Sequence, residues 1–376
     1  MNTLVRKITG FAAFAAFLVA LWLPGLDSML GFDPYPEPYE RRELAKWPGI
    51  PRSLDELYAF PVQFESYFND HFGLRSAFIH MNSLLRVRGL NVSSAKNAML
   101  GKEDWLYLAN PEVVDSYRVP RPSDAAQLER WTRTAQQRAN WCKKKGVRTL
   151  NVWLPEKQTL YPEFLPDWLE PAAPRTNLEV WTRQANKMKL PFLSLAPALR
   201  GAKETQLIFY RTDSHWNSYG AYAAYLAIMK RVTEIGVYPH VLGKKELVKK
   251  EIVKMGDIAQ LLNLEEYYLE SRRELRVRQP KAKPVPFQLR GQELPPHAQV
   301  QAFAQPDAQL PRIVIFSDSF GYEILPFLVE SFSRTVHVRY PHFSPEIILQ
   351  EKPDIVVELH AARHLEAAGD AGADEQ

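Results

Sequence analysis

Apolar and polar positions alternate with two different periods from about residue 121 onward. Helical apolar spacing covers five stretches, at 123–145, 177–189, 218–235, 321–333 and 345–352. Short apolar runs typical of buried strands follow or separate them, at 147–154, 191–195, 312–316, 335–340 and 354–359. Helices and strands in alternation predict an α/β fold, in which a mainly parallel sheet is covered by helices on both faces. Ligand sites in such sheets lie beyond the carboxyl ends of the strands.

Polar residues and glycines mark where several of these helices begin and end. Ser123 and Thr176 stand where N-caps are expected, and Asn217 or Ser218 opens the helix that follows. Gly146 stands where a helix commonly ends in the left-handed conformation. These signals place the turns between helices and strands.

The N-terminus carries a separate hydrophobic signal. Arg6 and Lys7 precede Ile8–Leu23, a run of sixteen uncharged residues that Pro24 is expected to break. Such a run is typical of a signal-peptide core or a short membrane anchor, within residues 1–32. We favour the anchor because no small-x-small cleavage site follows the run. In both cases the basic flank stays in the cytoplasm and the body of the protein is expected to be exported, held at the membrane in the anchored form.

The chain divides into segments of different composition. Residues 33–60 are rich in proline and predict an extended linker, and 64–75 predict a helix with an aromatic face that ends near Gly73. The main domain is expected to cover 61–365. Within it, the basic and proline-rich stretch 237–311 is interpreted as a partly helical insertion that forms part of a substrate groove. Residues 366–376 are small and acidic and are expected to be disordered.

Composition excludes several classes of function. With 376 residues, 46% of them hydrophobic, the chain can bury a large core. A formal net charge of +4 is too small to indicate nucleic-acid binding. Cys142 is the only cysteine, so neither an intramolecular disulfide nor a cysteine-based metal site can form, and we interpret it as a helix residue without chemistry.

Two short stretches carry candidate chemistry, and the first contains Ser319. The strand 312–316 leads into S-D-S-F-G, so a serine stands at a strand-to-helix turn, where a nucleophile is exposed and a helix N-terminus can stabilise an oxyanion. An ordinary N-cap is the structural alternative. Ser317 competes for the same role, but it lies closer to the strand, so Ser319 is the better candidate.

The second stretch is R-T-D-S-H-W at 211–216, just before the predicted helix at 218. A serine hydroxyl needs a base, usually a histidine held by a carboxylate, and His215 and Asp213 supply both. A turn aspartate and a surface histidine form the alternative. Asp-x-His also opens the ligand set of some metal-dependent phosphoesterases, but the remaining histidines form no second cluster with carboxylates, so no metal site is expected.

These residues allow a resemblance to be stated. The chain resembles the alginate O-acetyltransferase family of exported, SGNH-hydrolase-like polysaccharide O-acetylation proteins over roughly residues 40–365. The resemblance rests on six motifs in one order: R-E-L-A-K-W-P (42–48), Y-F-N-D-H-F-G-L-R (67–75), G-K-E-D-W-L-Y (101–107), L-P-E-K-Q-T-L-Y-P-E-F-L-P (154–166), T-D-S-H-W-N-S-Y-G-A (212–221) and S-D-S-F (317–320). It implies a three-layer SGNH-hydrolase-like fold with Asp-x-His before the serine turn.

The resemblance implies roles for single residues. Ser319 takes the position of the nucleophile, His215 of the base and Asp213 of the acid, while Ser317 stands where the motif usually has glycine. Arg363 matches an arginine near the C-terminus of relatives, whereas the glutamate that precedes it there is alanine here. Trp216, Tyr210, Lys157 and Arg363 are candidates for contacting the sugar, although packing inside the core is the simpler interpretation of the aromatic ones.

The implied reaction is transfer of an acetyl group to an exported polysaccharide through an acetyl-serine. The resemblance implies no cofactor in the chain, because the acetyl donor is supplied by a membrane-bound O-acyltransferase-type partner. Two alternatives stay open: a carbohydrate acetylesterase that uses the same triad with water as acceptor, and a non-catalytic glycan-binding scaffold.

Overall fold

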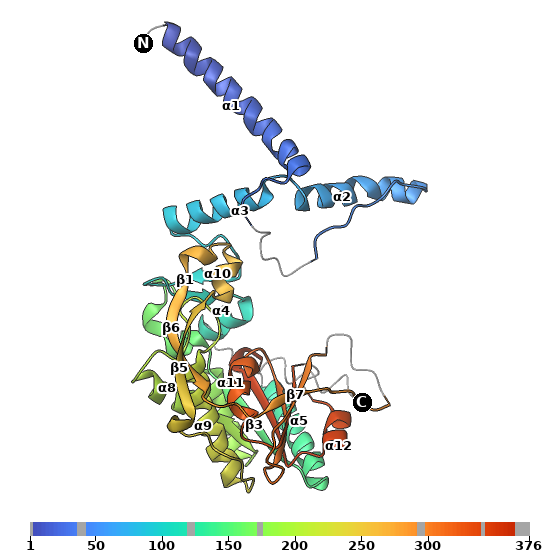
Figure 1. The fold of residues 1–376 in the computed structure, drawn as a ribbon, viewed down its shortest axis with the longest axis vertical. Helices are drawn as coiled ribbons and strands as arrows, with labels where there is room; N and C mark the ends of the chain where they lie inside the picture. The colour runs from blue at the N-terminus through green and yellow to red at the C-terminus, as the bar shows by residue number, and fades with distance from the viewer. Residues whose placement is uncertain are drawn as a thin grey trace. The chain divides into compact units, whose positions relative to one another are not determined.

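The computed structural model describes residues 3–35, 43–118, 125–170, 176–291, 298–339 and 343–364. The chain forms two compact units, Met1–Ala98 with Ala259–Tyr267, and Met99–Ile258 with Tyr268–Gln376 (Figure 1). The cap expected at Ser123 and the tail expected at 366–376 lie outside the described residues.

The first unit begins with a long apolar helix, α1 (Thr3–Leu30). Its stretch Thr9–Leu30 is long and apolar enough to cross a membrane, a property that signal sequences share. The break expected at Pro24 is wrong, because Pro24 lies inside the helix. Proline removes a single N–H from the helix, and the Pro24 carbonyl accepts a hydrogen bond of 3.1 Å from the Ser28 hydroxyl.

The helix expected at 64–75 is α2 (Leu54–Asp70), which begins ten residues earlier. Ser53 caps it by accepting a hydrogen bond from Glu56 N–H. The linker expected at 33–60 is therefore shorter than predicted and ends at Ser53, because the cap at Ser53 allows the helix to begin at Leu54. The aromatic face is confirmed, since the rings of Phe60, Phe64 and Phe68 stack one turn apart. The unit continues with α3 (Arg75–Leu84) and a π-helical turn, η1 (Leu85–Gly89).

The second unit is built on a seven-stranded sheet with the order β4-β3-β11-β9-β10-β8-β7. Its strands are β3 (Arg148–Leu154), β4 (Phe192–Ser194), β7 (Lys283–Val285), β8 (Val300–Ala304), β9 (Arg312–Ser317), β10 (Arg334–Val338) and β11 (Ile355–Ala361). The strands from β4 to β10 pair in parallel, whereas β8 and β7 add antiparallel pairs at one edge. The prediction of a mainly parallel sheet is confirmed, and the sheet is mixed.

Helices cover both faces of this sheet, which gives three layers. The helices are α5 (Ala125–Lys144), α7 (Asn177–Lys187), α9 (Ser218–Glu234), α11 (Gly321–Leu328) and α12 (Pro345–Glu351). Apolar residues of α9 and α11 pack with one set of strand residues, including Val152 and Ile315. Residues of α5, α7 and α12 pack with the alternate set, including Trp153 and Val314. In Figure 1, α9 and α5 flank the strands accordingly. The N-cap expected at Thr176 is confirmed at the start of α7, where it forms a capping box with Glu179.

The stretch 237–311 needs a correction. Its regular secondary structure is more strand than helix, because β5 (Leu247–Lys254) and β6 (Glu270–Val277) form an antiparallel two-stranded ribbon. Its strands β7 and β8 belong to the main sheet, so this part is not an insertion into the fold. β7 is difficult to recognise in the sequence, because it contains Pro284, a residue that an edge strand tolerates.

The remaining elements are short. They are β1 (Ala98–Leu100), β2 (Leu106–Leu108), α4 (Pro111–Arg118), α6 (Lys157–Leu160), η2 (Pro162–Phe164), α8 (Ala196–Lys203), η3 (Lys244–Glu246), α10 (Asp257–Leu261), η4 (Glu265–Tyr267) and η5 (Ala362–His364).

Candidate active site

Ser319 lies in the turn between β9 and α11, at the carboxyl edge of the sheet. The neighbouring Asp318 holds this turn in place. One oxygen of its carboxylate accepts a hydrogen bond of 3.0 Å from Phe320 N–H, and the other accepts one of 2.7 Å from Ala361 N–H on β11. The carboxylate therefore ties the turn to the neighbouring strand and leaves Ser319 half-buried at the edge.

Asp213 and His215 lie in the loop before α9, whose N-cap is Asn217. The loop brings His215 to the serine, and His215 Nε2 lies 2.7 Å from Ser319 Oγ. On the other side of the ring, His215 Nδ1 lies 2.7 Å from Asp213 Oδ1. An ionised carboxylate only accepts hydrogen bonds, so the proton belongs on Nδ1 and Nε2 is free to accept the serine proton. The two sequence stretches, about a hundred residues apart, thus meet in one hydrogen-bonded chain.

The pKa values of Asp213 and His215 are shifted in opposite directions. Burial alone would lower the pKa of His215, but the hydrogen bond and negative charge of Asp213 outweigh it and raise the pKa above its usual 6.5. Burial alone would raise the pKa of Asp213, but the hydrogen bond and charge of His215 hold that pKa well below its usual range. Asp213 therefore stays ionised wherever His215 titrates.

Asp257, at the start of α10, also contacts the Asp213–His215 loop, and sequence reasoning missed it. Its backbone N–H donates to Asp213 Oδ2 at 3.1 Å, and its carboxylate accepts hydrogen bonds of 2.7 Å from Ser214 N–H and 2.6 Å from the Ser214 hydroxyl. Gly256 lets this segment approach, since a Cβ there would lie 2.1 Å from the Thr212 carbonyl oxygen. No local motif marks Asp257, although a glycine before an aspartate is a weak sign of a close approach.

Lys157 binds the backbone of the loop that carries Asp213 and His215. Its ammonium donates to the backbone carbonyls of Leu106, Arg211 and Asp213 at 2.6, 2.8 and 3.0 Å. Burial lowers the pKa of Lys157 to about 7. The side chain is 3% exposed, so the prediction that Lys157 binds substrate is corrected: in this structure it fixes backbone.

The two aromatic candidates for the sugar site are also buried. Trp216 is fully buried and Tyr210 is 1% exposed. The Trp216 ring meets the Phe320 ring edge to face at 5.3 Å, while Lys254 lies 5.1 Å from the centre of the Tyr210 ring. Their prediction as sugar contacts is corrected in favour of packing, because both rings are buried inside the protein.

Arg363 lies beside the triad and is partly exposed. Its guanidinium donates to Glu156 at 2.8 Å and lies 5.5 Å from the centre of the Phe320 ring. Its charge opposes the rise in the pKa of His215. Its role as a substrate contact stays a prediction.

Ser317 occupies a different position from Ser319. Its hydroxyl is fully buried, lies 2.7 Å from His337 Nε2 and donates to the Asp318 carbonyl at 2.9 Å. A Cβ on Gly321 would lie 2.0 Å from this hydroxyl. Ser317 therefore fills the space below the turn, and the geometry favours Ser319 as the nucleophile.

The site also contains a group of possible metal ligands. Ligand atoms of Asp213, His215 and Asp257 all lie within 4.8 Å of one another. Each is already engaged, since Asp213 bonds to His215 and both carboxylate oxygens of Asp257 accept from Ser214. A cation here would have to displace these hydrogen bonds, so the arrangement fits a proton-transfer chain better than a metal centre.

Comparisons with known proteins identify the family of the chain. Residues 98–334 match the family model described as SGNH hydrolase-like domain, acetyltransferase AlgX. The chain is 30% identical over 126 residues to the probable alginate O-acetylase AlgJ of Pseudomonas aeruginosa, and 27% identical over 161 residues to that of Pseudomonas syringae pv. tomato. These stretches cover 33% and 43% of this chain but 30% and 39% of the relatives' own length.

Solved structures show the same fold. PatB1 of Bacillus cereus, solved with a sulfonyl adduct, has a TM-score of 0.53 and 15% identity, covering 71% of this chain and 97% of that one. The O-acetyltransferase domain of Pseudomonas putida AlgJ has a TM-score of 0.48 and 17% identity, covering 72% and 92%. The family model and the fold of PatB1 confirm the resemblance stated from the motifs and the SGNH-like α/β fold, and this chain belongs to the AlgX-type family of SGNH hydrolase-like acetyltransferase domains.

Proposed function

We propose that this protein is an O-acetyltransferase that modifies an exported bacterial polysaccharide through an acetyl-Ser319 intermediate. The observation that carries the proposal is the hydrogen-bonded chain from Ser319 Oγ through His215 to Asp213, with 2.7 Å at each step. This is the geometry that a serine needs in order to lose its proton as it attacks a carbonyl carbon. The transferred group is proposed to be acetyl because the family model describes an acetyltransferase domain.

The proposed reaction has two steps, acetylation of Ser319 and transfer of the acetyl group to a sugar hydroxyl. Ser319 Oγ attacks the acetyl carbonyl carbon of the donor ester while its proton moves to His215 Nε2, and the imidazolium then protonates the leaving oxygen. In the second half a sugar hydroxyl gives its proton to His215 and attacks the acetyl-serine, and the same proton returns to Ser319 Oγ. Asp213 holds the ring and stabilises the imidazolium in both halves.

Backbone geometry supplies a donor for the oxyanion. Ser319 N–H donates to no residue among those that the structure describes, and it stands just before α11. An N–H at a helix start carries positive partial charge, so it suits the negative oxygen of a tetrahedral intermediate.

The acetyl donor and the site of action follow from the same proposal. A body exported behind α1 has no access to acetyl-CoA of the cytoplasm, so a membrane-bound O-acyltransferase-type protein is proposed to pass the acetyl group outward. The α1 helix would hold the periplasmic domain near that partner. The polysaccharide is proposed to be alginate-like, after the name of the curated relatives.

The test is detection of the acetyl-serine. The full chain is incubated with p-nitrophenyl acetate, and intact-mass and peptide analysis should show one acetyl group on Ser319. Ser319→Ala should lose the adduct, while the matched control Ser317→Ala should keep it. Adding a polysaccharide acceptor then separates transfer from hydrolysis, because an acetylesterase releases acetate regardless of the acceptor. If the wild-type protein forms no adduct and shows no acceptor-dependent turnover, a non-catalytic glycan-binding scaffold becomes the better explanation.

A further inference from the structure

A polar cavity lies in the second unit at the end of the sheet away from the triad. It has a volume of about 350 Å³ and is bordered by the chain after α9, the turn η3, the end of β6 and the loop before β9. Because β9 runs from this loop to the serine turn, six residues at about 3.3 Å each separate the two places by roughly 20 Å. One sugar unit cannot occupy both.

Three carboxylates border this cavity, and two of them are held by several N–H donors. Glu330 is buried and accepts hydrogen bonds from the backbone N–H groups of Lys281 and Ala282. Glu246 accepts one from Gly243 N–H and one from His240, each at 2.8 Å. These bonds hold the pKa of Glu246 below its usual range. The third carboxylate, Asp307, is exposed and accepts a hydrogen bond of 3.0 Å from Gln309 N–H, so the two more enclosed carboxylates are not left to attract a cationic ligand.

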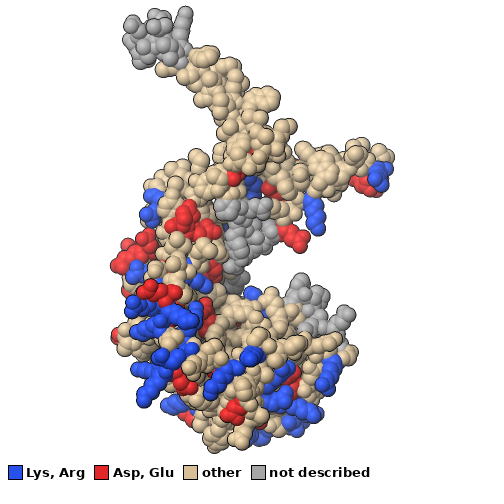
Figure 2. All heavy atoms as spheres, viewed as in Figure 1, with Lys and Arg blue, Asp and Glu red and all other residues tan. Residues whose placement is uncertain are grey.

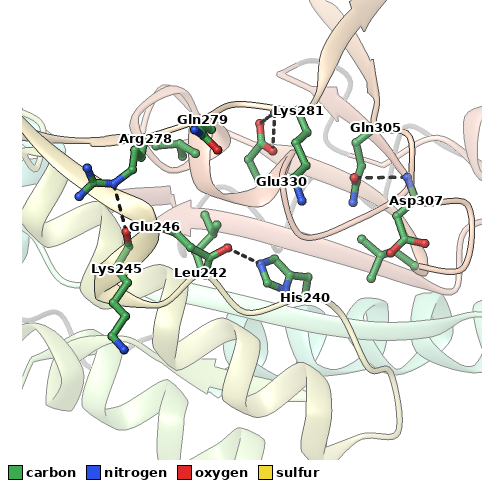
Figure 3. A pocket seen from close by; sticks show the side chains of 12 residues that line it. His240, Leu242, Lys245, Glu246, Arg278, Gln279, Lys281, Gln305, Asp307 and Glu330 are labelled. Carbon is green, nitrogen blue, oxygen red and sulfur yellow. Dashed lines mark hydrogen bonds and ion pairs between the residues drawn. The ribbon is translucent and has the colours of Figure 1, made fainter.

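The cations are not satisfied in the same way. No hydrogen bond or ion pair joins the ammonium groups of Lys245 and Lys281 to a residue in the described part of the chain. Figure 3 shows the Lys281 side chain extending into the space beside Glu330, and Lys245 and Arg278 at one end of the cavity. The Arg278 guanidinium donates only to backbone carbonyls, those of Lys245 and Leu247. The free donors are cationic and the acceptors are engaged, so the cavity suits an anion.

The β5–β6 ribbon connects this cavity with the triad. β5 leaves the cavity at Leu247 and ends at Lys254, whose ammonium lies 3.6 Å from Asp213 Oδ2. On the ribbon, Glu274 and Glu251 are paired with Arg272 and Arg273, whereas no ion pair joins Lys249 or Lys250 to a carboxylate within the described ranges. Figure 2 shows Lys and Arg gathered over the ribbon. A basic path therefore follows its eight-residue length, about 26 Å, from one site to the other.

We propose that the cavity and the ribbon form a remote subsite for carboxylate-bearing sugar units of the polymer whose hydroxyls are acetylated at Ser319. The inference rests on the proposed function, with its alginate-like acceptor, and adds to it a second place in the fold at which the same polymer is held. A long chain would be held at both ends of the ribbon, and each additional contact raises its effective concentration at the serine. A single uronic acid would reach one site alone.

The test compares Lys245→Ala/Lys281→Ala with the wild type. KM for a long alginate-derived oligouronate should rise about twofold to thirtyfold, which two exposed ion pairs supply. KM for a short oligouronate and the rate of acetyl-Ser319 formation from p-nitrophenyl acetate should not change. The matched control is Lys143→Ala/Lys144→Ala at the end of α5, which should resemble wild type in both assays.

Binding measured by calorimetry in a Ser319→Ala background separates this inference from the proposed function, because it requires no turnover. The long oligouronate should bind more tightly than its carboxyl-reduced counterpart, and added salt should remove the difference. Equal affinity for the two oligomers, or a double variant with wild-type affinity for the charged one, would overturn the remote subsite even if acetyl transfer at Ser319 is intact.

Discussion

Replacing Asp213 by asparagine tests the proton chain most directly. The carboxylate accepts three N–H groups, from His215 N at 2.9 Å, His215 Nδ1 at 2.7 Å and Asp257 N at 3.1 Å. Asparagine has one oxygen and cannot serve both sides. With the oxygen toward Asp257, its NH₂ group faces Nδ1, so the proton moves to Nε2 and the base is lost. With the oxygen toward His215, Asp257 N–H is left without an acceptor.

The size of both effects follows from these contacts. A histidine in the wrong tautomer lowers the rate about 10³–10⁴-fold in serine hydrolases with this arrangement. A buried N–H without an acceptor costs about 1–3 kcal/mol of stability. The variant should therefore lose most acetylation of Ser319. It should stay folded, because a loss of about 1–3 kcal/mol is smaller than the usual stability of a folded domain, about 5–15 kcal/mol.

The pH dependence gives an independent readout. His215 acts as a base only when neutral, so the wild-type rate should fall as the pH drops through its raised pKa, above 6.5. Asp213→Asn removes the stronger of the two carboxylates that raise this pKa and leaves only Asp257 against burial, which lowers it, so the acid limb should move to lower pH. The assay is acetyl-Ser319 formation over a pH series, with thermal melting beside it and exposed Asp167→Asn as control. A variant with the wild-type rate and an unmoved acid limb would refute the reasoning.

Other substitutions probe the surroundings of the serine. Ser317→Ala should keep the rate of acetylation but lower the melting temperature, because it removes the partner of His337 Nε2; a lost adduct would contradict this assignment. Gly321→Ala should cost about 1–3 kcal/mol in urea denaturation, because its Cβ would lie 2.0 Å from the Ser317 hydroxyl, and unchanged stability would show that the turn can shift. Lys157→Met should lower both stability, by about 3 kcal/mol or more, and activity, since three carbonyls lose their donor; a fully active variant would argue against its hold on the loop. Dialysis against EDTA should leave the rate unchanged, whereas a loss restored by added metal would make Asp257 a ligand.

Local sequence patterns predicted most of the α/β unit. Strand 312–316 and helix 218–235 were placed within one residue of β9 and α9, because continuous apolar runs and capping residues are signals contained in a few neighbouring positions. The proton chain was predicted for a related reason, since both stretches precede helices at the same edge of a parallel sheet.

The remaining features depend on contacts between distant parts of the chain. Asp257 reaches the loop of Asp213 because the β5–β6 ribbon delivers it there, and no pattern near residue 257 contains that information. An aromatic side chain such as Trp216 suits a core and a sugar site equally well, so its burial could not be decided from its type. The start of α2 was missed although Ser53 and Glu56 carry the capping pattern, because the prolines before them favoured a linker.

The way in which the two units share the chain limits how the protein can be shortened. Residues 259–267 group with the N-terminal unit, and Leu262 and Leu264 within them are fully buried. A fragment that starts near residue 98 would uncover these leucines a few positions beyond Asp257, and one that stops near residue 334 would lack β11, which lies between β3 and β9. Expression boundaries drawn at the limits of the family match would therefore yield an aggregation-prone product, so recombinant work should keep the residues of both units together.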